Sequence, residues 1–172
     1  MIRIRNLERI GESEIAALSD VLVDCVEGGD SIGFLYPMSR AKAVAFWAAA
    51  AESVARRERV VLVAEEADGT VVGTVTIIWA APENQPHRGD VAKMQVRRSA
   101  RRRGVGAALL TAAERVALEA GRTLLVLDTA SVDAERLYAR GGWQRCGEIP
   151  NYALMPDGAP CTTRLFFKSL RD

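Results

Sequence analysis

The chain has 172 residues, about the usual size of one domain, and 49% of them are hydrophobic while 26% are charged. These proportions are typical of a globular protein and exclude an intrinsically disordered chain. Twenty-three Lys and Arg residues face 22 Asp and Glu residues, for a net charge of +1, so no global field favours nucleic acid or an anionic membrane as a partner. Any anion must be bound by a local cluster of charge.

The cysteines and the hydropathy pattern bear on metals and location. Cys25, Cys146 and Cys161 are far apart, and the chain has one histidine, so we expect free thiols and no zinc site. In residues 1–5 apolar and basic residues alternate, so this segment lacks the apolar run of a signal peptide. The longest mostly apolar stretch, Val71–Ala81, is shorter than the ~20 residues of a membrane span. We therefore expect a cytoplasmic protein that needs no metal and no membrane.

The first half of the chain predicts a strand, two helices and two more strands. Alternation in residues 2–5 indicates a short strand, and Ser13 and Ser39 are candidate N-caps of two helices. Gly28 and the next glycine end the first helix. In the segment between the helices, Asp30–Met38, apolar residues follow neither the helical nor the strand period, which predicts an apolar loop. Two strands rich in β-branched residues follow over 59–64 and 71–80, joined by a turn at Asp68–Gly69.

The second half predicts strands that alternate with helices. In chain order we expect a surface loop at 82–89, a strand at 90–96, a helix at 105–120, a strand at 122–128, a helix at 132–140, and strands at 143–149 and 162–168. The uninterrupted apolar run Leu124–Leu127 is typical of a central strand covered on both faces. No linker interrupts this order, so residues 1–172 are expected to form one α/β domain with a mixed sheet.

The segment Val96–Ala107 carries the strongest chemical signal. It lies between a predicted strand and a predicted helix, contains five arginines within Arg97–Arg103, and includes Gly104 and Gly106. A helix start leaves backbone N–H groups without partners and carries partial positive charge. Glycines without a Cβ let an anion approach that backbone closely. The segment therefore predicts a diphosphate-binding turn, with a solvated basic turn or a nucleic-acid patch as the alternatives.

Two known phosphate-binding motifs do not fit this segment. No Gly-Lys-Ser/Thr follows, so it is not a P-loop, and the third glycine of the dinucleotide fingerprint is missing. Arg101–Gly106 instead resembles the Gln/Arg-x-x-Gly-x-Gly/Ala signature of the GNAT superfamily of N-acetyltransferases. Ala134–Tyr138, followed by Gly142–Trp143, resembles a second motif of that family, A-x-x-L-Y-x-x-x-G-[FYW]. Segments 149–154 and 157–158 resemble the branch typified by the tabtoxin-resistance acetyltransferase.

The resemblance implies a fold and a co-substrate. The fold is a mixed, mostly antiparallel sheet flanked by about four helices, with two central parallel strands that splay apart. Acetyl-CoA would lie between the splayed strands 90–96 and 122–128, with its diphosphate on the glycine turn. The residues that the resemblance assigns to acetyl-CoA are Met94, Gln95, Val96, Arg101, Arg102, Arg103, Gly104, Val105, Gly106, Ala107, Ser131 and Ala134. Ser131 stands where many relatives have asparagine.

The resemblance also assigns the proton transfers. Tyr138 would protonate the thiolate that leaves, and a carboxylate or a water would take the proton from the acceptor amine. Asp128, at the carboxyl end of a buried strand, and Asp90, at the start of the other splayed strand, are the candidate bases. Each is equally compatible with a structural hydrogen bond, Asp128 as a helix N-cap. His87 lies in a polar loop, and we expect it at the surface.

The acceptor is less defined by the sequence than the acyl donor. Phe34, Tyr36, Trp79 and Tyr152 are candidate walls of an acceptor pocket, or members of the core. The leading hypothesis is acetyl transfer to a small amine, such as an amino acid derivative or an antibiotic. Alternatives are transfer to a protein N-terminus or lysine, and a non-catalytic acyl-CoA-binding module. Nucleic-acid binding is disfavoured by the neutral charge balance. A monomer and a homodimer fit the sequence equally well.

Overall fold

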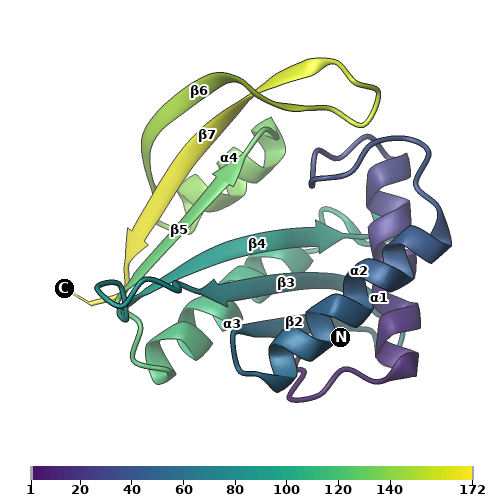
Figure 1. Cartoon of the computed structure of the whole chain (residues 1–172), viewed down its shortest axis with the longest axis horizontal. Coiled ribbons are helices and arrows are strands. Elements are labelled where there is room, and N and C mark those ends of the chain that lie inside the picture. Colours follow the sequence, from purple (N-terminus) through teal and green to yellow (C-terminus); the bar gives the residue numbers. More distant parts are fainter. Residues whose placement is uncertain (1, 172) are drawn as a thin grey trace.

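The computed structural model describes residues 2–171 and contains one seven-stranded sheet in the order β1-β2-β3-β4-β5-β7-β6 (Figure 1). The strands are β1 (Arg3–Asn6), β2 (Arg59–Glu65), β3 (Val71–Trp79), β4 (Arg88–Val96), β5 (Leu124–Thr129), β6 (Gln144–Leu154) and β7 (Pro160–Ser169). Neighbouring strands are antiparallel except for β4 and β5, which are parallel. The predicted mixed, mostly antiparallel sheet is confirmed.

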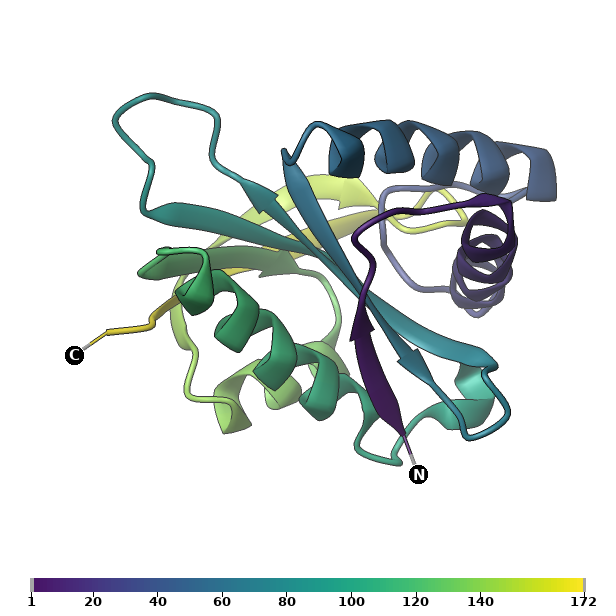
Figure 2. The ribbon, with the colours of Figure 1, turned by 90° about the horizontal axis from the view of Figure 1, so that it is seen from below.

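Four α-helices cover the two faces of the sheet. They are α1 (Glu12–Glu27), α2 (Arg40–Ala55), α3 (Val105–Glu119) and α4 (Val132–Arg140), with a short 3-10 turn at Arg98–Ala100. Figure 2 shows α1 and α2 on one side of the sheet and α3 and α4 on the other. Each pair covers its own buried hydrophobic cluster. Among the described residues, no helix has the length and hydropathy to cross a membrane.

The start of α1 corrects one prediction. Its N-cap is Gly11, not Ser13, because the Glu14 carboxylate accepts the Gly11 N–H at 3.1 Å and Ser13 already lies in the first turn. The predicted cap of α2 is confirmed, since the Ser39 hydroxyl accepts the Lys42 N–H at 3.1 Å. A carboxylate three residues into a helix can replace a side-chain cap, which is why the serine alone misplaced the boundary.

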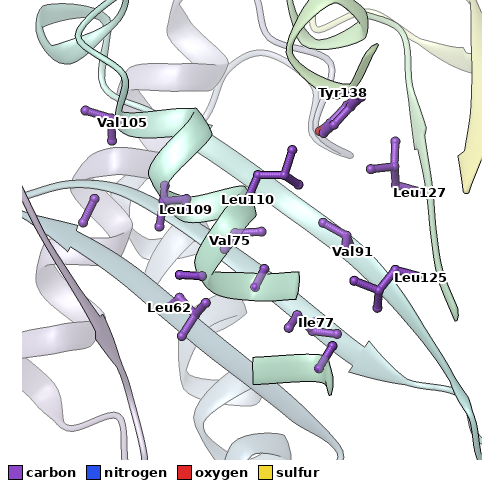
Figure 3. Packing of buried hydrophobic residues seen from close by; sticks show 14 of the residues in the cluster. Leu62, Val75, Ile77, Val91, Val105, Leu109, Leu110, Leu125, Leu127 and Tyr138 are labelled. Atoms are coloured by element: carbon purple, nitrogen blue, oxygen red, sulfur yellow. The ribbon is translucent and has the colours of Figure 1, made fainter. Parts of the chain in front are cut away.

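Helix α3 is held against the sheet by one apolar stripe. Val105, Leu109, Leu110, Ala113 and Ala117 are all at most 3% exposed, and their spacing follows the period of a helix. Figure 3 shows the leucines packed over side chains of the central strands. Burying each leucine contributes about 1.5–3 kcal/mol. This packing fixes the position of the helix start, where the predicted diphosphate turn lies.

The two parallel strands separate after a short ladder. Only three residue pairs join β4 to β5, from Arg88 opposite Leu124 to Asp90 opposite Val126. Beyond them β5 turns away with β7, while β4 stays paired with β3 and continues toward the start of α3 (Figure 1). The predicted splayed pair of strands is therefore confirmed. Its open end lies beside the start of α3.

A β-bulge interrupts β4 in the part that pairs with β3 but no longer with β5. Thr74 pairs with Gln95 and Thr76 with Ala92, so two residues of β4, Lys93 and Met94, lie opposite the single residue between those threonines. Lys93 has a φ of 51°, in the left-handed region that residues with a Cβ seldom adopt. A bulge of this kind re-aims the side chains of the strand that carries it.

Candidate active site

The separation of β4 and β5 opens a cleft of about 900 Å³. Its walls come from the second half of β4, the turn into α3, the end of β5, α4, β6 and the loop between α1 and α2. The residues of the predicted acetyl-CoA set that line it are Met94, Val96, Arg101, Arg102, Gly104, Val105, Gly106, Ala107, Ser131 and Ala134. Segments far apart in the sequence thus meet around one cavity.

The turn into α3 presents a row of free backbone N–H groups to this cleft. Gly104 is the N-cap, with a φ of 80° and no side-chain cap, and the first helical bond runs from the Ala108 N–H to the Gly104 carbonyl at 3.0 Å. Within residues 2–171, the N–H groups from Arg102 to Ala107 donate to no backbone or side-chain acceptor. Such a concave row at a helix start is an anion-binding geometry.

The glycines of this turn have different physical roles. A Cβ on Gly104 would meet no atom within 4 Å, but its left-handed φ strains any other residue. A Cβ on Gly106 would lie 3.2 Å from a methyl carbon of Leu137 on α4. Gly104 therefore shapes the turn and keeps its outer side open, while Gly106 lets α3 and α4 approach.

The arginines around the turn are not equivalent. Arg101 pairs with Asp30 at 2.5 Å, and Arg103 pairs with Glu66 at 2.8 Å on the far side of the turn, outside the cleft. Arg102 lines the cleft and has no carboxylate within 4 Å among the described residues. Of the three, Arg102 is the cation that remains available to an anion. The structure does not bring the predicted Arg103 side chain to the cleft.

Only part of the predicted strand segment Met94–Val96 lines the cleft. Met94 and Val96 line the cleft, whereas the side chain of Gln95 is 1% exposed and lies outside it. Neither polar atom of the Gln95 amide has a partner in the part of the chain that the structure describes. The Val96 carbonyl accepts from the Arg101 side chain at 3.0 Å. Gln95 is therefore a buried residue paired with Thr74 of β3, and the structure does not bring its side chain to the cleft.

Tyr138 reaches the cleft from the core side of α4. It is 4% exposed, and its ring packs against Trp143 and Phe166 with centroids 5.9 Å away in each case. Figure 3 shows it at the edge of the cluster beneath α3, beside Leu127. Its hydroxyl donates to no protein acceptor within residues 2–171, and burial together with the charge of Asp128 raises the pKa of Tyr138 to about 12. The phenol is therefore protonated at any physiological pH.

Asp128 lies at the end of β5 on the wall of the same cleft. The buried hydroxyl of Thr163 on β7 donates to its carboxylate at 2.9 Å. The N-cap of α4 is Ser131, whose hydroxyl accepts the Ala134 N–H at 3.3 Å. Asp128 is therefore not a helix cap, and its second carboxylate oxygen makes no hydrogen bond to the described residues.

Asp90 and Trp79 lie at the other end of the sheet. Asp90 belongs to the paired part of β4, and its carboxylate binds the Arg88 guanidinium at 2.6 Å. The guanidinium of Arg122 stacks on Trp79 at 4.9 Å. Neither residue lines the cleft. The structure thus does not bring these two predicted residues to the site, and His87 is exposed as expected.

The predicted aromatic wall is reduced to one residue. Tyr152 on β6 lines the cleft and is 55% exposed. Phe34 packs edge-on against Phe46 of α2 at 5.3 Å, and the Tyr36 hydroxyl donates to the Glu27 carbonyl at 3.3 Å. Neither Phe34 nor Tyr36 lines the cleft. The aperiodic loop gave no signal for the direction of their side chains.

The cleft also contains Lys93, which the sequence did not single out. It is half-buried, its ammonium lies 6.0 Å from the ring centroid of Phe34 and 5.7 Å from that of Phe46, and no carboxylate lies within 4 Å in the described chain. Burial lowers the pKa of Lys93, and the charge of Asp128 partly opposes that effect. A lysine between the apolar residues Ala92 and Met94 of the strand was the one available signal.

Comparison with solved structures identifies the fold. A structure named as a phosphinothricin N-acetyltransferase has 18% identity and a TM-score of 0.80, with each chain fully covered. An acetyltransferase from Salmonella typhimurium, solved with acetyl-CoA, has 17% identity and a TM-score of 0.78 over 100% of this chain and 95% of the other. A ribosomal-protein-alanine N-acetyltransferase from Brucella melitensis has 22% identity and a TM-score of 0.78 over 98% and 99%.

The sequence itself matches a family profile over most of its length. The profile of the acetyltransferase (GNAT) family matches residues 18–143, a span that runs from α1 through β4, α3 and β5 to the end of α4. This span includes the free N–H groups at the start of α3 and both Asp128 and Tyr138. The chain therefore belongs to the GNAT family of acetyltransferases, enzymes that use acetyl-CoA as their co-substrate.

Proposed function

We propose that this enzyme transfers the acetyl group of acetyl-CoA to the amine of a small acceptor bound in the cleft between β4 and β5. The observation that carries the proposal is the row of free N–H groups from Arg102 to Ala107 at one end of a cleft that also holds Tyr138 and Asp128. If the diphosphate of acetyl-CoA binds at that row, the pantetheine arm with its thioester can extend along the edge of β4 that β5 leaves unpaired.

The residues present fit the diphosphate of the co-substrate. Free N–H groups at a helix start favour an anion, Gly104 keeps the turn open, and Arg102 adds a cation without a protein partner among the described residues. Ser131 and Ala134, at the start of α4, line the opposite wall. We assign the diphosphate to the α3 turn and the pantetheine arm to the unpaired β4 edge around Met94 and Val96.

Bound acetyl-CoA supplies an activated thioester. Asp128 accepts a proton from the acceptor ammonium, because only the neutral amine has the lone pair that attacks the acetyl carbon. As the C–N bond forms and the C–S bond breaks, the Tyr138 hydroxyl gives its proton to the leaving sulfur. The nitrogen loses its second proton, which returns to the Tyr138 oxygen, and the high pKa of Tyr138 favours that return.

Contacts at the mouth of the cleft are an argument for a small acceptor. The loop between α1 and α2 is tied to the hairpin of β6 and β7, since the Tyr36 N–H donates to the Pro156 carbonyl at 2.8 Å and the Ser31 hydroxyl lies 3.7 Å from the Cys161 sulfur. These contacts tie together two segments that both contribute to the walls of the cleft, and a cleft bounded in this way suits a small acceptor. The resemblance to the tabtoxin-resistance branch and the likeness to a structure named for phosphinothricin agree with this choice.

Calorimetric titration with acetyl-CoA tests the proposal. Gly104→Trp places a bulky side chain at the turn and is expected to weaken binding at least ten-fold. Gly69→Trp is the matched control, because Gly69 has a similar φ of 86° and an equally open surrounding in the β2–β3 turn. Equal affinity in both variants would contradict the assignment.

The acceptor class is tested in parallel. The enzyme is incubated with acetyl-CoA and either a panel of small amines or a panel of peptides, and acetylated products are detected by mass spectrometry. The proposal predicts products in the small-amine panel. Acetylation confined to peptides would replace the small acceptor by a protein, as the name of the Brucella melitensis structure states for that enzyme.

A further inference from the structure

Lys93 is a cation without a counter-ion inside the cleft. Its ammonium lies near the α1–α2 loop, where a Cβ on Gly33 would be 3.5 Å from it, and over the rings of Phe34 and Phe46. Aromatic faces attract a cation but do not neutralise it. Because removing an ammonium from water without a partner charge is unfavourable, this position favours a ligand with negative charge.

The bulge in β4 is what directs Lys93 to this place. Val91 packs in the cluster beneath α3, and strict alternation would turn Lys93 to the same face. The extra residue shifts the alternation, so Met94 and Val96 pack toward α3 while Lys93 contacts Phe34 and Phe46 on the α1–α2 side. A strained φ of 51° is retained at a residue whose side chain lines the cleft.

Asp128 provides the opposite charge across the same cleft. Its carboxylate is held by Thr163 at 2.9 Å and makes no ion pair with Lys93, so more than 4 Å separates their charged atoms. The two nevertheless interact electrostatically, because Asp128 raises the pKa of Lys93 against the effect of burial. One cation and one anion therefore face a common space that neither fills.

We propose that the acceptor is of amino-acid type, with its oxyanion bound by Lys93 and its amine held at Asp128. This inference rests on the proposed function and names the substrate class for the same site. Lys93 acts as a specificity-determining residue. The diphosphate of acetyl-CoA does not compete for it, because the free N–H groups and Arg102 form a separate anion site at the start of α3.

The test compares amino acids with their carboxamides as acceptors, since the carboxamide removes the negative charge that Lys93 would bind. We expect kcat/KM for the acids to exceed that for the amides at least ten-fold in the unaltered enzyme. Lys93→Met is expected to bring this ratio close to one, mainly through a higher KM for the acids. Lys93→Arg is expected to restore part of the preference.

Lys42→Met is the matched control. Lys42 is also a lysine over the Phe34 ring, at 5.7 Å, but it is exposed on α2 and does not line the cleft. We expect the acid-to-amide ratio to be unchanged in this variant. A ratio near one in the unaltered enzyme, or a ratio that survives Lys93→Met, would overturn the inference.

A second measurement separates this inference from the proposed function. Calorimetry of acetyl-CoA binding and mass spectrometry of products from neutral amines report on the cleft without involving an acceptor oxyanion. Binding and turnover without preference for acids would reject the role of Lys93 and leave the proposed function in place. Absence of acetyl-CoA binding at millimolar concentration would reject both.

Discussion

Asp128 and Tyr138 line one cleft from consecutive elements of the fold, and burial, reinforced by the charge of Asp128, raises the pKa of Tyr138 to about 12. The different surroundings of the two side chains suit them to different roles in proton transfer. In the proposed mechanism Asp128, exposed and held by Thr163, accepts a proton, while Tyr138, buried among aromatic rings, keeps its proton for the leaving group. Such separation of two titratable groups is characteristic of acid–base sites.

Tyr138→Phe should lower kcat about 10²-fold with little change in KM, because the substitution removes only the proton donor. The ring keeps its contacts with Trp143 and Phe166, so we expect the melting temperature to change by only a few degrees. Steady-state kinetics and thermal unfolding measure the two effects. An unchanged kcat would remove Tyr138 from the chemistry.

Exchange of each candidate carboxylate for its amide should distinguish the two bases. Asp128→Asn is expected to reduce kcat/KM more than ten-fold, whereas Asp90→Asn should have an effect below two-fold, because Asp90 lies at the paired end of β4 and binds Arg88. The measurement is kcat/KM at neutral pH. The opposite order of effects would show that the splayed end is not the site of proton transfer.

Arg102→Gln should weaken acetyl-CoA binding several-fold and reduce its dependence on salt, because a cation without a protein partner contributes by screened attraction to the phosphates. Arg115→Gln, on the exposed side of α3 in an ion pair with Glu119, is the control for the loss of one positive charge. Titrations at two ionic strengths check both variants. Equal losses would indicate only a general electrostatic effect.

The buried thiol of Cys25 predicts a loss of stability at high pH. Burial, and then the charge of Asp30, raise its pKa from 9.0 to about 12. The folded state binds the Cys25 proton more tightly than the unfolded chain does. The protonated thiol therefore makes its full contribution to the free energy of unfolding below about pH 9, and this contribution is lost as the pH rises toward 12. The loss is on the order of 4 kcal/mol.

Cys25→Ala removes that titration. We expect the variant to be less stable near neutral pH, where it has lost a buried side chain, but to lose less stability between pH 9 and 12. Urea unfolding at a series of pH values measures both slopes. Parallel curves for the two proteins would contradict the assignment to Cys25.

The sequence predicted the parts of the site that follow from periodicity and from local motifs. The stripe of Leu109 and Ala112 predicted α3, and the glycines at its start predicted the turn whose backbone N–H groups the structure leaves free. The apolar run Leu124–Leu127 predicted the central strand β5, which has Asp128 next to its last residue. These signals are local, because each depends on residues within a few turns of helix or one strand.

The residues that prediction missed or misplaced depend on contacts between distant segments. Arg103 is turned from the cleft by Glu66, which lies in a different hairpin. Asp90 was a candidate base, but the ladder with β5 forms at its end of β4 and the opening at the other end. Lys93 escaped notice because the bulge, which only the pairing with β3 reveals, reverses the face that alternation predicts for it.

A crystal structure of the enzyme with coenzyme A tests the central claim most directly. We predict that diphosphate oxygens lie about 3 Å from the backbone nitrogens between Arg102 and Ala107, with the thiol end near the Tyr138 hydroxyl. A diphosphate bound elsewhere, with those N–H groups bonded to water or to the protein, would contradict the account.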